Sequence, residues 1–239
     1  MKILVTNDDG INAVGIKTLV EKLKKYSNEI IVVAPSVEMS ATSHKLTLRE
    51  GIEFEKVNDI IEGVKSYKAT ATPADCVKLG IIYLGFKPDI VFSGINNGYN
   101  HGDDIMYSGT IAAACEASFL GYKGIAVSCK ANTFDGIEKF DEVFEYLLKS
   151  DIYKKSNLIN INFVKDAKGI KITHQGRYPF DATYIRKEDG KLYISAKPNP
   201  SKYYNDIDTD VVALEDGYIS ISPLSFDRTD ILLFQSLKK

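Results

Sequence analysis

The sequence is poor in the residues that mark several classes of protein. It has no tryptophan, three cysteines and three histidines among 239 residues. No apolar run approaches the roughly 20 residues needed to cross a bilayer, and no signal peptide precedes the first apolar run. Cys76, Cys115 and Cys129 are far apart and lie in apolar segments, which favours reduced, buried thiols over disulfides or a zinc site. We therefore predict a cytoplasmic protein without a membrane segment.

An excess of charge of either sign is also lacking. The formal net charge is -2 at pH 7, which argues against a protein that binds a nucleic-acid duplex, since such a protein would carry a basic stripe. Hydrophobic residues make up 44% and charged residues 26% of the chain, which is ordinary for a globular protein. The length suits one large domain, or a core domain with an appendage.

Short apolar runs alternate with segments of helical periodicity over the first 165 residues. This alternation predicts an α/β fold with a doubly wound, mostly parallel, Rossmann-like sheet. The predicted strands are 2–6, 29–34, 45–49, 67–70, 89–93, 124–128 and 158–163, and the predicted helices are 15–26, 72–83, 111–120 and 134–149.

The pattern changes from about Lys165 onward, where polar turns rather than helices separate the apolar runs. We predict strands at 170–174, 183–186, 192–196 and 218–222. Residues 1–165 would then form the α/β catalytic core, and 166–239 a β-rich, hairpin-containing extension with oligomerisation arms. A short helix at Ile231–Leu237, capped by Asp227 or Thr229, is predicted near the end.

The first strand ends in Asn7-Asp8-Asp9-Gly10. In open α/β sheets the carboxyl ends of the strands form the rim at which ligands bind. Two adjacent carboxylates repel each other, and a divalent cation between them allows both to stay ionised. The alternative is that these residues only shape a turn or cap a helix.

Two further loops, 35–44 and 94–108, should lie on the same rim. They add several hydroxyls, including that of Ser40, and the amides of Asn96 and Asn97. All are hard oxygen donors, and only His44 and His101 offer nitrogen. The site therefore suits Mg²⁺ or Mn²⁺ better than Zn²⁺, and we predict one divalent ion per subunit.

The helix after the long loop begins at Ser108-Gly109-Thr110. Its first N–H groups, its dipole and two hydroxyls would attract a phosphate, and the glycine allows close approach. Taken alone, this tripeptide is an ordinary cap. The Walker phosphate loop, the dinucleotide fingerprint, the nucleophile elbow and the histidine metalloprotease motif are all missing from the sequence.

Several stretches of the chain resemble the SurE (survival protein E) nucleotidases. They are Ile3–Gly10 with Gly15–Ile16, Val32–Pro35 with Ser40, Thr72–Val77, Pro88–Gly98, Gly102–Asp104, Tyr107–Ala114, Thr209–Asp210 and Glu215–Leu224. The resemblance implies a metal-dependent phosphomonoesterase acting on nucleoside 5′- and 3′-monophosphates, in some members also on short-chain polyphosphate. It implies a homodimer or homotetramer formed through C-terminal arms, and the metal ligands Asp8, Asp9, Ser40 and Asn96.

On this basis the predicted catalytic residues are Asp8, Asp9 and Asn96, with a metal-activated water attacking phosphorus. The predicted phosphate-binding residues are Asn97, Ser108, Gly109 and Thr110. One alternative is an aspartyl-phosphate on Asp8, although Gly10 stands where the haloacid-dehalogenase type of that route requires a second Asp. Another is a metal- and nucleotide-binding regulatory protein without turnover.

The chain also departs from the family at a few positions. Asn12 and Val14 replace an aromatic or His and a Pro, while Met39 and Ala41 replace the Arg and Gly that often flank the metal-binding Ser. The missing positive charge at Met39 would alter phosphate affinity or substrate preference. Four tyrosines are candidates for stacking on a base, although packing in the core or an interface is the favoured explanation for them: Tyr99, Tyr107, Tyr203 and Tyr204.

Overall fold

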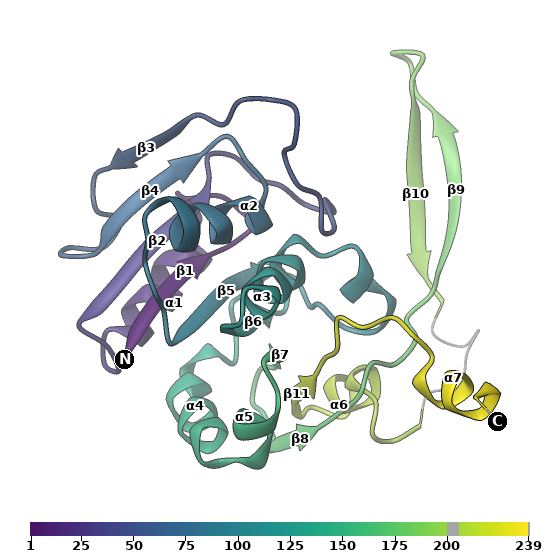
Figure 1. Cartoon of the computed structure of the whole chain (residues 1–239). Coiled ribbons are helices and arrows are strands. Elements are labelled where there is room, and N and C mark those ends of the chain that lie inside the picture. Colours follow the sequence, from purple (N-terminus) through teal and green to yellow (C-terminus); the bar gives the residue numbers. More distant parts are fainter. Residues whose placement is uncertain (200–205, 239) are drawn as a thin grey trace.

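The computed structural model describes residues 1–199 and 206–238. One nine-stranded sheet runs through the molecule in the order β3-β4-β2-β1-β5-β6-β7-β11-β8 (Figure 1). Its strands are β1 (Lys2–Thr6), β2 (Glu29–Pro35), β3 (Phe54–Val57), β4 (Lys65–Ala69), β5 (Ile90–Asn97), β6 (Lys123–Cys129), β7 (Leu158–Phe163), β8 (Ile170–Ile172) and β11 (Ile219–Pro223).

The sheet is mostly parallel, as predicted. Six neighbouring strands, from β4 to β7 in the sheet order, run in the same direction. The antiparallel pairs of this sheet are β3 with β4 and β11 with β7. Long stretches of the parallel strands are fully buried because helices cover both faces of the sheet.

Helices α1 (Val14–Leu23) and α4 (Phe140–Lys149) lie on one face, and α2 (Pro73–Lys78) and α3 (Gly109–Phe119) on the other. The first strand shows the division directly. Ile3 and Val5 belong to the core with α1 and α4, whereas Leu4 belongs to the core with α2 and α3, because successive side chains of a strand point to opposite faces. The remaining helical segments are η1 (Leu79–Tyr83), η2 (Gly102–Met106), η3 (Ile137–Lys139), α5 (Asp151–Lys155), α6 (Asp210–Glu215) and α7 (Ile231–Leu237).

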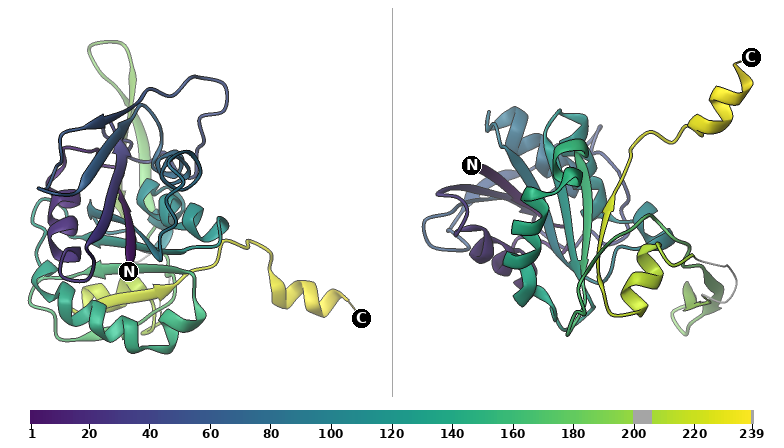
Figure 2. Two further views of the ribbon diagram at one scale, coloured as in Figure 1. Left: turned by 60° about the vertical axis from the view of Figure 1, so that its left-hand side comes forward. Right: turned by 90° about the horizontal axis from the view of Figure 1, so that it is seen from below.

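The later part of the chain divides between the sheet and two projecting elements. Strands β8 and β11 extend the edge of the main sheet. Strands β9 (Phe180–Arg186) and β10 (Leu192–Pro198) form a separate antiparallel hairpin that stands clear of the body in Figure 1. Helix α7 also extends away from the body (Figure 2). The division of the chain at residue 165 stays a prediction.

Three local predictions were wrong. Residues 45–49 form no strand, because side chains bind their backbone instead: the Thr47 N–H donates to Asp75 Oδ2 (3.0 Å), and the Lys45 carbonyl accepts from the Thr72 hydroxyl (2.8 Å). The helix predicted from residue 134 begins at Phe140, after the turn η3. The cap of α7 is Asp230 rather than Asp227 or Thr229.

The three cysteines are free and buried, as predicted. Across the described ranges 1–199 and 206–238, none of the helices has both the length and the apolar character that a bilayer span requires.

Candidate active site

Three loops meet at the carboxyl ends of β2, β1 and β5, which are neighbours in the sheet. The Ile11 N–H donates to the Pro35 carbonyl (2.8 Å) and the Met39 N–H to the Asp8 carbonyl (2.7 Å), so the first two loops are joined. The Asn97 N–H donates to Asp9 Oδ2 (3.2 Å) and joins the third. The rim predicted from the strand order is therefore a contiguous structure.

Asp8 is 5% exposed and packs against the start of α3. The Thr110 hydroxyl donates a hydrogen bond to Asp8 Oδ1. A Cβ atom at Gly109 would lie 3.0 Å from Asp8 Cβ and 3.2 Å from its Oδ2, so only glycine allows this approach without displacement. Ser108 is the N-cap, and its hydroxyl accepts from the Ile111 N–H (3.1 Å).

Burial makes ionisation of both carboxyl groups unfavourable. It raises the pKa of Asp8 to about 6; the Thr110 hydrogen bond opposes this rise and the neighbouring Asp9 charge adds to it. Burial also raises the pKa of Asp9, where the Asn97 N–H acts in the opposite direction and the charge of Glu38 in the same direction. A cation would stabilise the ionised form of both.

The residues present at the rim suit a hard divalent cation. Within the described ranges, no Lys, Arg or His forms an ion pair with Asp8 or Asp9. Asn96 Nδ2 donates to the Gly98 carbonyl (2.8 Å), which leaves the Asn96 amide oxygen available as a ligand. The same ranges contain no group of three or more His, Cys, Asp or Glu that could hold a metal. An ion here would therefore rely on two carboxylates and neutral oxygens.

Two predicted site residues are engaged with other neighbours. Ser40 is exposed, and its hydroxyl donates to Glu38 Oε1 (2.6 Å). Asn97 Oδ1 accepts from the Asn132 N–H (2.6 Å), so this side chain is held by the turn after β6. Glu38 is a residue of the rim that the sequence reasoning missed, because a single Glu in a polar loop carries no local signal.

The structure also brings residues to the long loop that the sequence did not single out. Buried Asn100 is hydrogen-bonded to Ser128, Asn160 and Asn162 at the ends of β6 and β7. Buried Asp210, at the start of α6, accepts from the Gly102 N–H (3.0 Å). The alternating Asn160 and Asn162 within a buried strand were the available signal for the first of these contacts.

The two candidate histidines lie outside the carboxylate pair. His44 Nε2 is 2.8 Å from Glu116 Oε2, and its ring stacks on Phe119. Hydrogen bonds to Cys115 and Glu116 raise the pKa of His44 to about 9. His101 is buried between the rings of Tyr99 and Tyr178, and burial lowers its pKa.

Tyr107 is 63% exposed at the rim, whereas Tyr99 is partly buried. Tyr203 and Tyr204 lie outside the described residues.

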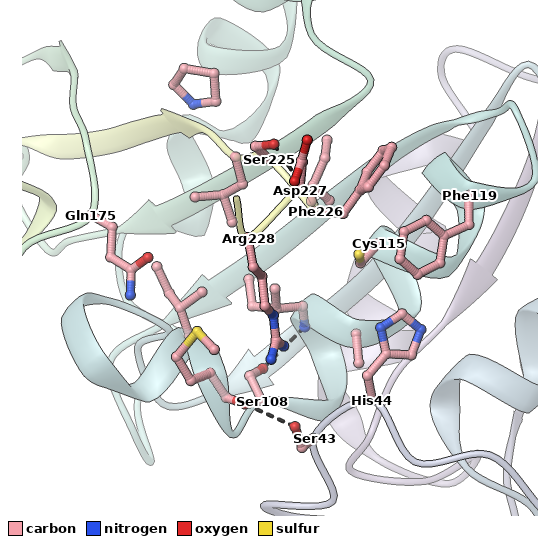
Figure 3. Close-up of a pocket in the computed structure, with 17 residues that line it drawn as sticks. Ser43, His44, Ser108, Cys115, Phe119, Gln175, Ser225, Phe226, Asp227 and Arg228 are labelled. Atoms are coloured by element: carbon pink, nitrogen blue, oxygen red, sulfur yellow. Dashed lines mark hydrogen bonds between the residues drawn. The ribbon is translucent and has the colours of Figure 1, made fainter. Parts of the chain in front are cut away.

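A cavity of about 560 Å³ lies beside α3 (Figure 3). The N-cap of α3 and the helical residues three, four, seven and eleven positions after it line the cavity, as expected for one face of a helix: Ser108, Ile111, Ala112, Cys115 and Phe119. Gly109 and Thr110 instead face Asp8. The Arg228 side chain enters this cavity from the segment after β11. The cavity is therefore on the side of α3 turned away from the carboxylates.

Known proteins resemble the chain in both sequence and fold. A family model described as "Survival protein SurE" matches residues 3–182. The chain is 44% identical to a 5′-nucleotidase SurE of Thermoanaerobacter sp. (strain X514), over 96% of this chain and 94% of the relative. It is 41% identical to the 5′-nucleotidase SurE of Caldanaerobacter subterraneus, over 99% of this chain and 95% of the relative. The crystal structure of the SurE protein from Aquifex aeolicus superposes with a TM-score of 0.79 at 33% identity, covering 100% of this chain and 98% of that one.

Proposed function

The chain belongs to the survival protein SurE family, and on this basis we propose that it is a divalent-metal-dependent nucleotidase. It hydrolyses nucleoside 5′- and 3′-monophosphates, with short-chain polyphosphate as a further substrate. The observation that supports this most directly is the packing of buried Asp8 against the start of α3. This contact puts carboxylates suited to a cation beside N–H groups suited to a phosphate.

In this proposal Asp8, Asp9, Ser40 and Asn96 hold one Mg²⁺ or Mn²⁺ ion per subunit. A bound ion would supply Lewis-acid activation and charge neutralisation during phosphoryl transfer. The raised pKa values of Asp8 and Asp9 and the available Asn96 oxygen support this donor set. For Ser40 to take part, its hydroxyl must leave Glu38 Oε1.

The phosphate would lie against the N-terminus of α3. We propose that its oxygens are bound by the backbone N–H groups of Ser108, Gly109 and Thr110 and by the side-chain amide of Asn97. The same groups would stabilise the charge that develops during hydrolysis. The Thr110 hydroxyl has a separate task, because its hydrogen bond fixes the orientation of the Asp8 carboxylate.

Phosphate release from 5′-AMP and 3′-AMP, measured with Mn²⁺ and with EDTA, tests the proposal. Asp8→Asn keeps the shape of the side chain but removes one ligand charge, and we expect kcat to fall by roughly 100-fold or more. EDTA should abolish turnover of the wild type. A variant with wild-type kcat would contradict the assignment of the site.

The same assay separates the alternatives. A regulatory protein would bind the nucleotide and release no phosphate. A covalent route would leave a phosphorylated Asp8 that can be trapped by acid quench, whereas direct attack by water would leave none.

We further propose that the chain assembles as a homodimer or homotetramer through its C-terminal arms. A two-stranded hairpin is marginally stable alone, yet β9 and β10 carry apolar side chains that are half exposed or more, such as Tyr184, Ile185 and Ile194. Burial of these side chains against another subunit would stabilise the hairpin. The free cysteines support the proposed location in the cytoplasm.

A further inference from the structure

The loop of residues 98–108, here the rim loop, connects β5 with α3 and so joins the two halves of the proposed site. Its first anchor is Asn100, which is 5% exposed. The Asn100 carbonyl accepts from Asn160 Nδ2 (2.7 Å) and Asn162 Nδ2 (2.9 Å), and its N–H donates to Asn162 Oδ1 (2.9 Å). These bonds fix the beginning of the rim loop on the ends of the central strands.

The second anchor is a single carboxylate that belongs to a distant part of the chain. Asp210 is the first residue of α6 and is completely buried. Its Oδ2 accepts from the Gly102 N–H (3.0 Å), while its Oδ1 accepts from the N–H groups of Gly176 (2.8 Å) and Val211 (2.9 Å). Asp210 therefore joins the rim loop, the segment leading into the β9–β10 hairpin, and α6.

The rim loop and the segment leading into the β9–β10 hairpin, here the hairpin root, are also tightly packed against each other. Gly102 has a φ of +52°, and a Cβ atom there would lie 2.8 Å from Tyr178 Cβ and 3.0 Å from Tyr178 N. Gln175 Nε2 donates to the Gly102 carbonyl (2.8 Å), and the Tyr178 N–H donates to Asp103 Oδ2 (2.9 Å). A shift of the hairpin root would thus be transmitted to the middle of the rim loop.

The charge on Asp210 is needed for this arrangement. No Lys or Arg in the part of the chain that the structure describes forms an ion pair with it. The titratable group near it is His101, whose pKa is lowered by burial, and the Asp210 carboxyl group is held by the three N–H donors. An asparagine has one acceptor oxygen, and its NH₂ group would face an N–H donor at the other position. Asp210→Asn must therefore release either Gly102 or the Gly176 and Val211 side of the contact.

We propose that Asp210 is a positioning residue of the nucleotidase reaction. Its carboxylate fixes the rim loop on the hairpin root and thereby sets the distance between Asn96 and Asn97 on one side and Ser108 to Thr110 on the other. This inference rests on the proposed function. Beyond that function, it states that the geometry of the active site depends on residues in the C-terminal part of the chain.

The test compares Asp210→Asn with the wild type in full-length protein, using 5′-AMP and Mn²⁺. A displacement of about 1 Å in the groups that hold a reacting phosphate can lower a rate by roughly 100-fold. We expect kcat to fall by roughly 10- to 100-fold, with KM within about threefold of the wild type. Hydrogen exchange of the amides in residues 98–108 should become faster in the variant, a readout that does not depend on turnover or on metal.

The matched control is Asp216→Asn, at the other end of the same helix, where the carboxylate is exposed and pairs with Lys171 (3.5 Å). The kcat of this control variant and the hydrogen exchange of its residues 98–108 should stay at the wild-type values. If Asp210→Asn does not fold, Gly102→Ala disturbs the same junction through Tyr178 and should lower kcat in the same way.

Two results would overturn the inference. One is a wild-type kcat in a variant whose rim loop shows faster hydrogen exchange, and the other is unchanged hydrogen exchange of the rim loop. Either result leaves the proposed function intact. A wild-type chain that releases no phosphate from any nucleoside monophosphate would instead overturn the proposed function, and the positioning role with it.

Discussion

The contact between Asp8 and Gly109 leaves no space for another atom. A Cβ atom at residue 109 would approach Asp8 Cβ to 3.0 Å and Pro73 Cγ to 3.2 Å, so Gly109→Ala must move the carboxylate or the start of α3. We predict a roughly tenfold or greater loss of kcat with a shift in Tm of only a few degrees. Gly51→Ala is the control, because a Cβ atom there meets nothing within 4 Å. Equal activities of the two variants would contradict the prediction.

Asp8 and Asp9 form no ion pair within the described residues, and we therefore predict that a divalent ion stabilises the folded chain. A ligand that binds only the folded state at 100 times its Kd adds about 2.7 kcal/mol to the free energy of unfolding. Mn²⁺ should therefore raise Tm by several degrees, and EDTA should reverse the rise. Thermal unfolding of Asp8→Asn provides the comparison, and an equal rise in the variant would place the ion elsewhere.

Helix α3 lies so close to β6 that one glycine is required between them. A Cβ atom at Gly124 would lie 1.9 Å from the Ala114 carbonyl oxygen. Gly124→Ala must push the helix away from the sheet, and we predict a loss of about 3 kcal/mol in the free energy of unfolding. Urea denaturation measures this loss, with Gly51→Ala again as control. A loss below about 1 kcal/mol would mean that the helix can shift freely.

The segment around His44 is held against α3 by a charged contact that depends on pH. Hydrogen bonds to Cys115 and Glu116 raise the pKa of His44 from 6.5 to about 9, and Lys78 Nζ lies 3.1 Å from the other Glu116 oxygen. Because the pKa is higher in the folded state, the stabilisation is complete below pH 6.5 and disappears as the pH rises through about 9.

We therefore predict that the wild type exceeds His44→Gln in Tm by about 2–4 °C at pH 6, and that this difference shrinks toward zero by pH 10. Thermal unfolding of both proteins across this range measures it. A difference that stays constant with pH would show that the ring contributes by packing on Phe119 alone.

The elements that the sequence predicted well are those whose burial decides their structure. β1, β2, β6 and β7 are buried along almost their whole length and lie between two helical layers, so local pattern and tertiary position agree. Residues 45–49 alternate apolar and polar side chains as a half-buried strand would, but their backbone groups bind Asp75 and Thr72. Periodicity cannot reveal such bonds, because the partners lie about 27 residues away in the sequence.

The same distinction holds for the candidate site. Strand order places Asp8, Asp9, Asn96 and Asn97 on one rim, because the carboxyl ends of neighbouring parallel strands share an edge. The contact of Asp210 with Gly102 spans 108 residues and depends on how α6 packs after β11 has joined the sheet. No local spacing indicates it.

The exposed hairpin predicts an oligomer that a single charge can disrupt. Ile194 is 63% exposed at the middle of β10, and an aspartate there would have to be buried in any interface that covers it. Ile194→Asp should shift the chain to a smaller species in size-exclusion chromatography with light scattering. Leu48→Asp, at a site 83% exposed in a loop, should leave the mass unchanged. A monomeric wild type would contradict the proposed assembly.

The position of β11 between β7 and β8 has a consequence for the biosynthesis of the protein. The ribosome makes Asp8 about 200 residues before Asp210, and β8 has no partner in the main sheet until β11 emerges beside it. A nascent chain that stops before α6 would expose the edge of β7 and leave the loop before α3 without Asp210, its second anchor. Catalytic competence should therefore appear late in translation, after most of the parallel sheet has already formed.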